Sequence, residues 1–231
     1  RKAGIRGNIL ILGYTHPKDF CLLRRYRLTQ TVIDSTYASQ LNRYGKKLEV
    51  HIGIDTGMHR LGIACENIDE LRRIYRMKHL KIKGLFTHLC ASDGTSCKEK
   101  DFTAEQARAF YRTVGQLQEE GLPCPCLHLL ASYGIRNYPQ YAGDYARVGI
   151  ALYGVFSTRE DTSALPLRPV LSLKARIVTV KDLAPGESAG YGLAFTAKRP
   201  TKLAVLSIGY ADGLPRALSC GKGQVLINGH R

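Results

Sequence analysis

Short apolar runs alternate with amphipathic segments along the first two thirds of the chain. Their length and apolar content are typical of strands buried on both faces. The six runs are Asn8–Gly13, Thr31–Asp34, Leu48–Asp55, Ile82–His88, Cys126–Ser132 and Arg147–Gly154. Strands that alternate with helices predict a parallel sheet with both faces covered.

Helix-start signals lie between these runs. Pro17 follows Thr15 and marks one start, and Ser35 is the expected N-cap of the next helix. Thr103 and Gln106 have the spacing of a capping-box pair and predict a helix start there.

The basic run Arg72–Lys83 contains six Lys or Arg residues and no acidic residue. Its start overlaps apolar positions Ile68, Leu71, Ile74 and Tyr75, which recur at helical spacing. We therefore expect an amphipathic helix whose basic face is solvated.

The pattern changes after Gly154. A polar, proline-containing connection at 157–169 leads to apolar runs with few helical signals. The runs are Val170–Val180, Lys202–Tyr210 and Gln224–Asn228, with turn signals at Pro185-Gly186 and Asp212-Gly213. The sequence thus predicts a first domain at 1–156 and part of a second, β-rich domain at 170–231.

Six alternating strands are too few to close a (β/α)8 barrel, which needs eight strands and about 250 residues. The fold class we expect is α/β: an incomplete (β/α)8 TIM-type barrel with strands 3 to 8, followed by part of a C-terminal β domain. On this view, two βα units would precede Arg1.

Composition narrows the function classes. The 231 residues are 44% hydrophobic, which is typical of a globular protein, and no apolar run approaches a membrane span. The net charge of +15 permits nucleic acid, an anionic surface or an anionic small ligand as partner, although no nucleic-acid-binding motif is present.

The seven cysteines are odd in number and scattered, and Cys124-Pro125-Cys126 has no second pair. This pattern predicts reduced thiols in a cytoplasmic compartment and no metal site.

Functional residues of such a barrel lie at the carboxyl ends of its strands. Those ends carry Arg60, His88, Ser132, Arg147 and Gly149. Cations, a hydroxyl and a glycine backbone together suit a small anionic ligand such as a phosphate ester. Taken singly, each has a structural explanation: a surface arginine, a rim histidine, a helix cap, a strand-edge charge and a packing glycine.

Five segments resemble those of alanine racemases: IDTGMHRLGI, THLCASD, RVGIALYG, AGYGLAFTA and IGYADGLPR. These racemases are pyridoxal 5'-phosphate enzymes with an N-terminal (β/α)8 barrel and a C-terminal β domain. The resemblance runs along essentially the whole chain. GMHRLG and SYGIRNYP are most similar to the racemase portion of membrane-attached serine/alanine racemases of vancomycin resistance.

The resemblance implies cofactor contacts in the first domain. Arg147 donates to the pyridine nitrogen, and Ser132 with the backbone N–H groups of Gly149 and Ile150 holds the phosphate. An arginine at the ring nitrogen weakens the electron sink and favours simple proton exchange. His88 orients Arg147.

The resemblance also implies the substrate contacts. Arg60 hydrogen-bonds the phenolic oxygen of the cofactor and lies near the substrate carboxylate. Tyr191 is the base for the L-isomer, and Tyr210 lines the entrance. Since Tyr191 reaches the other subunit's cofactor, the active unit is a homodimer. Without the resemblance, Tyr191 reads as a packed tyrosine in a glycine-rich turn.

The match has gaps. The family's cofactor-bound lysine, the base for the D-isomer, falls upstream of Arg1, so we expect this chain alone to lack racemase activity. Gly53 replaces a bracing lysine, His59 replaces a glycine, and Ala131 replaces an asparagine.

The leading hypothesis is part of an alanine racemase that supplies D-amino acid for peptidoglycan. Serine is the rival substrate. Two alternatives from other classes stay open: a catalytically silent pyridoxal-phosphate binder and a basic anion- or nucleic-acid-binding barrel.

Overall fold

A computed structural model describes residues 3–156, 166–219 and 221–230 of the chain. Contacts divide it into two compact units, Arg1–Val170 and Leu171–Arg231. Most of the expected connection at 157–169 lies outside the described residues.

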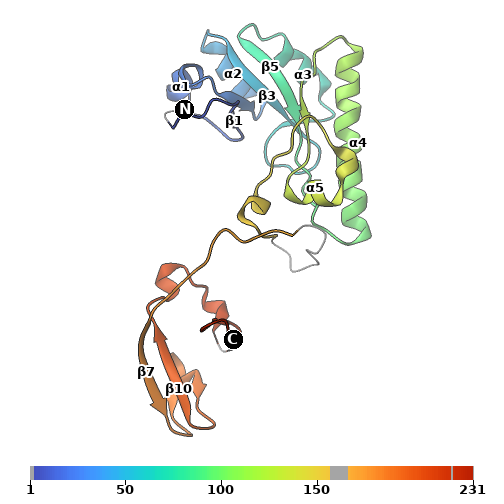
Figure 1. Ribbon diagram of the computed structural model, residues 1–231. Coiled ribbons are helices and arrows are strands. Elements are labelled where there is room, and N and C mark those ends of the chain that lie inside the picture. Colours follow the sequence, from blue (N-terminus) through green and yellow to red (C-terminus); the bar gives the residue numbers. More distant parts are fainter. Residues whose placement is uncertain (1–2, 157–165, 220, 231) are drawn as a thin grey trace. The chain divides into compact units, whose positions relative to one another are not determined.

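A parallel sheet forms the centre of the first unit (Figure 1). Its strand order is β1-β2-β3-β5-β6, and the short β4 pairs with the end of β3. The strands are β1 (Leu10–Ile11), β2 (Thr29–Val32), β3 (Leu48–Asp55), β4 (Ile63–Ala64), β5 (Leu80–Phe86) and β6 (Leu127–His128). Because neighbouring strands are parallel, their carboxyl ends meet at one edge.

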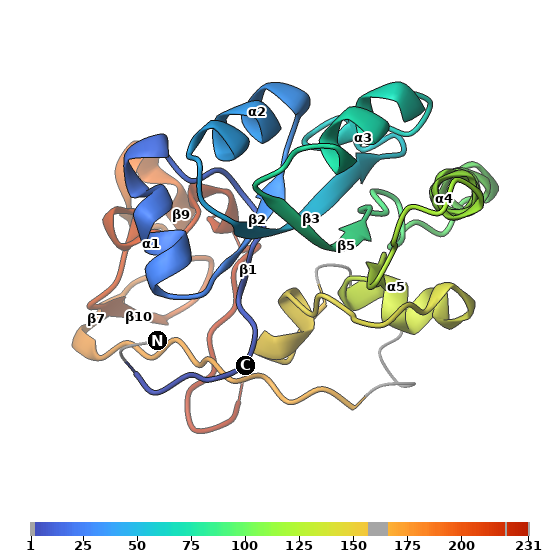
Figure 2. The same cartoon turned by 90° about the horizontal axis from the view of Figure 1, so that it is seen from above.

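Helices lie in an arc outside the curved sheet, as Figure 2 shows. They are η1 (Pro17–Asp19), α1 (Phe20–Arg25), α2 (Ser35–Arg43), α3 (Ile68–Tyr75), α4 (Cys97–Glu119) and α5 (Ser132–Asn137), followed by the short η2 (Pro139–Tyr141) and η3 (Ile150–Tyr153). The core packs between sheet and helices; fully buried members include Ile52, Leu71 and Phe110. Burying these large side chains stabilises the layer by about 2 kcal/mol each.

The sixth expected strand, Arg147–Gly154, is wrong as a strand. Arg147 makes a single parallel bridge to Ala131, and the chain then turns into η3. The backbone N–H groups of Gly149 and Ala151 donate to Ser132 Oγ, at 3.0 and 3.2 Å, instead of to a neighbouring strand. A side-chain acceptor has replaced the strand partner.

Two helix starts also differ from expectation. Asp34, not Ser35, caps α2, since its carboxylate accepts from the Tyr37 N–H at 2.6 Å. The capping box of α4 is Ser96 with Glu99, and the expected pair, Thr103 and Gln106, is buried about two to three turns inside the helix. Pro17 begins η1, which leads directly into α1, as expected.

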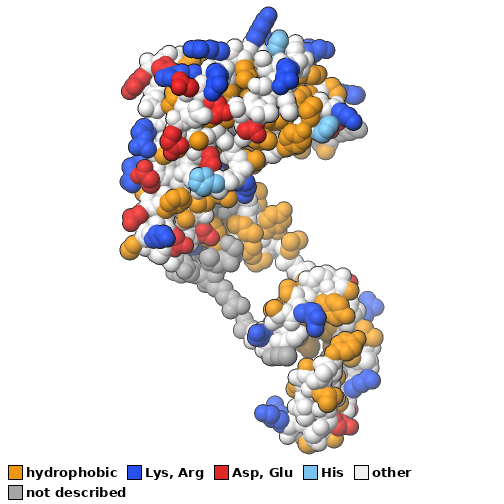
Figure 3. All heavy atoms as spheres, turned by 180° about the vertical axis from the view of Figure 1, so that it is seen from behind, with side chains coloured by type: hydrophobic (Ala, Val, Ile, Leu, Met, Phe, Trp, Pro, Cys, Tyr) orange, Lys and Arg blue, Asp and Glu red, His pale blue; other side chains and the backbone are white. Residues whose placement is uncertain are grey.

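The basic run is not one helix. Helix α3 ends at Tyr75 and strand β5 begins at Leu80, because the later part of the run pairs with β3. Acidic side chains form ion pairs with two of its cations. Arg72 bonds to Asp69 at 2.6 Å and to Glu120, and Lys81 bonds to Glu49 at 3.2 Å. On the face drawn in Figure 3, basic and acidic side chains of this unit are interspersed.

The second unit is β-rich and small. Strands β7 (Ile177–Leu183) and β10 (Thr201–Leu206) form one antiparallel pair, and β8 (Ser188–Ala189) and β9 (Phe195–Thr196) form another. Single turns complete it: η4 (Tyr191–Leu193), η5 (Tyr210–Asp212) and η6 (Arg216–Leu218). The expected strand at 170–180 begins only at Ile177, and 224–228 forms no strand.

Candidate active site

A cavity of about 420 Å³ opens at the carboxyl ends of the strands in the first unit. Its lining includes all six residues of that unit that the sequence nominated: Arg60, His88, Ser132, Arg147, Gly149 and Ile150. They come from four separate loops, so only the parallel sheet brings them together. Its size is that of a small-molecule site.

Arg147 is the best-anchored of these side chains. Its Nη1 donates to His128 Nδ1 at 2.6 Å and to the His128 carbonyl at 2.9 Å. Its Nη2 donates to the carbonyls of Thr87 and Leu129, at 2.6 and 3.1 Å. The guanidinium also lies over the Phe86 ring, 5.0 Å from its centroid. These contacts together fix the orientation of the guanidinium group.

This cation has no counter-ion within the described residues, since none of their ion pairs includes Arg147. Burial lowers the pKa of Arg147 to about 10, so it stays charged at neutral pH. Burial, reinforced by Arg147 and Arg60, lowers the pKa of His88 to about 4, so that ring is neutral. The part of the cavity beside Arg147 is therefore electropositive and suits an anion or an unprotonated ring nitrogen.

Ser132 and the turn after Arg147 form a second polar feature. Ser132 is buried at the start of α5, and its Oγ accepts hydrogen bonds from the backbone N–H groups of Gly149 and Ala151. The space beside the Gly149 Cα is open, because an added Cβ would meet no atom within 4 Å. A ligand oxygen can thus approach this backbone closely.

Arg60 follows a tight loop at the end of β3. The Asp55 carboxylate accepts from the N–H groups of Gly57 and His59, both at 3.0 Å, and from the His59 ring at 3.1 Å. Burial alone would raise the pKa of Asp55, but these hydrogen bonds hold it below its usual value. His59 has a φ of 54°, in the region that favours the family's glycine, and the bonds to Asp55 hold it there.

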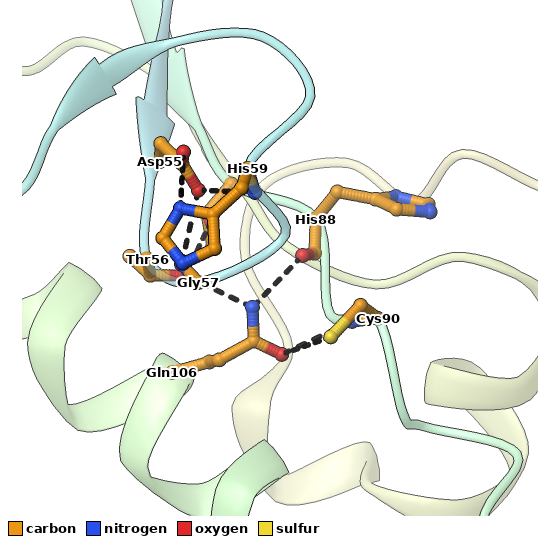
Figure 4. Close-up of polar contacts among 8 residues, drawn as sticks. Asp55, Thr56, Gly57, His59, His88, Cys90 and Gln106 are labelled. Carbon is orange, nitrogen blue, oxygen red and sulfur yellow. Dashed lines mark hydrogen bonds and ion pairs between the residues drawn. The ribbon is translucent and has the colours of Figure 1, made fainter.

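The sequence predicts Gln106 in a helix cap, but in the structure its side chain hydrogen-bonds to loops at the ends of two strands. It reaches from α4 between two strand-end loops, as Figure 4 shows. Its amide donates to Thr56 Oγ1 at 3.3 Å and to the His88 carbonyl at 3.2 Å, and its oxygen accepts from the Cys90 N–H at 3.0 Å. It ties the loop of Arg60 to that of His88. Only its polar character within an apolar helix face hinted at this.

His51 and His128 were also missed as site residues. Both are buried, His51 on β3 and His128 on β6, and His128 contacts both His51 and Arg147. The available signal was a histidine flanked on both sides by buried apolar residues, Val50 and Ile52 for His51 and Leu127 and Leu129 for His128. Gly53 and Ala131, two of the positions that depart from the family pattern, line the cavity.

The two nominated tyrosines belong to the second unit. Tyr191 lies on η4 and is 94% exposed, and Tyr210 lies on η5 and is 66% exposed. Gly190 precedes Tyr191 with a φ of 84° and Gly192 follows with a φ of 66°. These left-handed glycines present the tyrosine at the tip of a turn.

No described helix of either unit is long and apolar enough to span a bilayer.

Two protein-family models match this chain, one for each unit. The family model for the N-terminal domain of alanine racemase matches residues 1–157, and that for the C-terminal domain matches residues 170–231. The chain belongs to the alanine racemase family. The resemblance stated from its motifs is confirmed, and so is the fold class, an incomplete parallel barrel followed by a β domain.

Individual racemases give the degree of similarity. An amino-acid racemase of Enterococcus faecalis is 44% identical and covers 100% of this chain, and a serine/alanine racemase of Enterococcus gallinarum is 41% identical and covers 95%. The chain spans 33% and 32% of their lengths. It thus corresponds to about a third of these relatives.

Solved alanine racemases share the fold. The Clostridium difficile 630 enzyme superposes with a TM-score of 0.80 at 32% identity, over 93% of this chain and 57% of that one. The Bartonella henselae enzyme, solved with covalently bound pyridoxal phosphate, gives 0.75 at 28% identity over 94% and 60%.

Proposed function

We propose that this chain forms part of a pyridoxal-phosphate-dependent racemase that interconverts L- and D-alanine and supplies D-amino acid for the cell wall. The observation that carries the proposal is the fixed guanidinium of Arg147, which has no ion-pair partner among the described residues and lines a cavity with open space beside Gly149. Membership of the alanine racemase family supports it.

The residues present fit the cofactor. A buried cation without a carboxylate partner among the described residues favours an anionic or electron-rich ligand, and the backbone beside Gly149 has room for a phosphate. Arg147 would donate to the ring nitrogen, and Ser132 with Gly149 and Ile150 would hold the phosphate. His88 would orient Arg147, whose Nη2 lies 3.4 Å from His88 Nδ1. When bound, pyridoxal 5'-phosphate supplies the electron sink that makes the α-proton of an amino acid acidic.

The protein's own groups then bind substrate and move the proton. Arg60 would hold the substrate carboxylate, because it is a cation on the loop beside the cofactor residues. Tyr191 would take the α-proton of the L-isomer, and racemisation needs a second base on the opposite face of Cα. Tyr210 would line the entrance to the site.

We further propose that two subunits share each site and that the protein acts in the cytoplasm. A turn-tip tyrosine that is 94% exposed suits insertion into a partner's cavity. Apolar side chains of the second unit are also exposed, among them Leu171 at 75% and Leu173 at 77%, as at an assembly surface.

The test is isomer interconversion by the complete gene product with pyridoxal phosphate, wild type against Tyr191→Phe. The variant should bind cofactor with an unchanged absorbance spectrum yet lose 10²-fold or more of its L-to-D rate. Tyr14→Phe, outside the cavity, is the matched control. An unimpaired Tyr191→Phe enzyme would refute the role of Tyr191.

Serine is the second candidate substrate, favoured by the 41% identical serine/alanine racemase. The ratio of kcat/KM for the two amino acids decides between them. The non-catalytic alternatives predict other results: a silent binder shows the cofactor spectrum without turnover, and a nucleic-acid binder shows salt-dependent DNA binding and no spectral change.

A further inference from the structure

A buried cluster lies next to Arg147, outside the lining of the candidate active-site cavity. It consists of His51 on β3, His128 on β6 and Cys126 just before β6. All three are buried, and their ligand atoms lie within 4.8 Å of one another. Two contacts in series connect His51 to Arg147 through His128. His51 Nδ1 lies 2.8 Å from His128 Nε2, and His128 Nδ1 lies 2.6 Å from Arg147 Nη1.

The direction of these hydrogen bonds follows from Arg147. A guanidinium only donates, so His128 Nδ1 must carry no proton and accept. A neutral imidazole then carries its proton on Nε2, and that proton points at His51 Nδ1, which must accept in turn. One arrangement of protons therefore satisfies both contacts, and it places the His51 proton on Nε2.

Both rings are neutral in this arrangement. Burial, with the charge of Arg147 and the neighbouring ring, lowers the pKa of His128 to about 3. Burial, Lys83 and Arg147 lower the pKa of His51 to about 4, against a smaller opposite effect of Glu49. The chain thus leaves the positive charge of Arg147 uncompensated while directing its guanidinium.

A metal ion is the other use for two histidines and a cysteine. Coordination at His128 Nε2 would require the ring proton on Nδ1, where it would face the Arg147 N–H at 2.6 Å. The cations Arg147 and Lys83 also oppose a further positive ion. The geometry therefore favours the hydrogen-bonded chain over a metal centre.

The packing around the rings holds this arrangement. His128 stacks on Phe86, with ring centroids 4.9 Å apart and an angle of 6°. His51 stands against Gly84 of β5, where an added Cβ would lie 2.7 Å from His51 Cε1 and 2.8 Å from the Cys126 carbonyl. Glycine is required there so that the ring can approach the neighbouring strand.

We propose that His51 is a positioning residue for Arg147: by accepting the Nε2 proton of His128, it keeps His128 Nδ1 bare for the guanidinium. The significance for catalysis rests on the proposed function, because Arg147 is the residue assigned to the cofactor ring. The proton arrangement itself does not depend on any cofactor.

The experiment compares His51→Asn with His51→Leu in the complete gene product. Asn places a carbonyl oxygen near the position of Nδ1 and can still accept, whereas Leu fills similar space and cannot. The readouts are the ring nitrogen resonances of His128 after nitrogen-15 histidine labelling, the pyridoxal phosphate dissociation constant by absorbance, and the thermal melt as a check on folding.

In wild type and His51→Asn, His128 should show a protonated Nε2 and a bare Nδ1. His51→Leu leaves the Nε2 proton of His128 without an acceptor, so that Arg147 alone favours this tautomer. A mixture of the two tautomers should then appear, and pyridoxal phosphate should bind about three- to tenfold more weakly, the effect of one misplaced hydrogen bond. The proposal is overturned if His128 keeps the same tautomer in His51→Leu, or if wild-type His128 carries its proton on Nδ1.

Cobalt(II) provides the test of the metal alternative. Thiolate-to-cobalt absorbance that disappears in Cys126→Ala would show a metal site and overturn the proposal, whereas no such band supports it. If no variant binds pyridoxal phosphate while the tautomer result holds, the proposed function fails and the hydrogen-bonded chain stands.

Discussion

Acid should destabilise the first unit through its buried histidines, and His51 is the cleanest case. The His51 ring is buried against Gly84 of β5, and its pKa in the folded protein is about 4. The groups that face it are Lys83, Arg147, His128 and, with the opposite sign, Glu49. In an unfolded chain a histidine titrates near pH 6.5.

The sign and size follow from linkage. Between pH 6.5 and 4 the unfolded state binds a proton that the fold does not, so stability is complete above pH 6.5 and falls as the pH is lowered. At pH 5 the folded ring is still neutral, and the cost depends on the unfolded pKa alone: 1.5 pH units, or about 2 kcal/mol. This value changes little if the folded pKa differs by a few tenths.

The assay is urea unfolding by circular dichroism at pH 7.5 and 5.0 for wild type and His51→Asn. The variant keeps an acceptor for His128 but cannot titrate, and all other groups cancel in the difference between the two proteins. It should lose about 2 kcal/mol less stability than wild type on acidification. Equal losses in both proteins would show that His51 is not held neutral by the fold.

Three further substitutions test particular contacts. Ser132→Ala removes the acceptor of Gly149 and should weaken pyridoxal phosphate binding about tenfold by absorbance titration, whereas Ser39→Ala on α2 should not; equal affinities would contradict the phosphate cradle. Gln106→Leu leaves the Cys90 N–H without its acceptor and should lower the free energy of unfolding by about 2 kcal/mol, unlike Gln118→Leu on the exposed face of α4. Ser96→Ala breaks the capping box and should cost about 1 kcal/mol in urea unfolding; no change would place the start of α4 elsewhere.

The sequence by itself determined the order of the elements and the edge of the sheet at which function lies. Strand β3 has the bounds that its apolar run predicted, Leu48–Asp55, because β-branched residues at every second position, Val50, Ile52 and Ile54, are a local pattern typical of a strand. The residues nominated at the strand ends line one cavity because parallel strands end at the same edge.

Only the tertiary structure decided how those residues are held. Arg147 leaves the sheet after one bridge because Ser132, Thr87 and His128 offer its segment better hydrogen-bond partners. Gln106 and His51 act across separations of 50 and 77 residues, to Thr56 and His128, that no local pattern encodes. Hydrophobic periodicity is local and can be read from the sequence, whereas the partner of a buried polar group is set by whichever distant side chain the fold brings within reach.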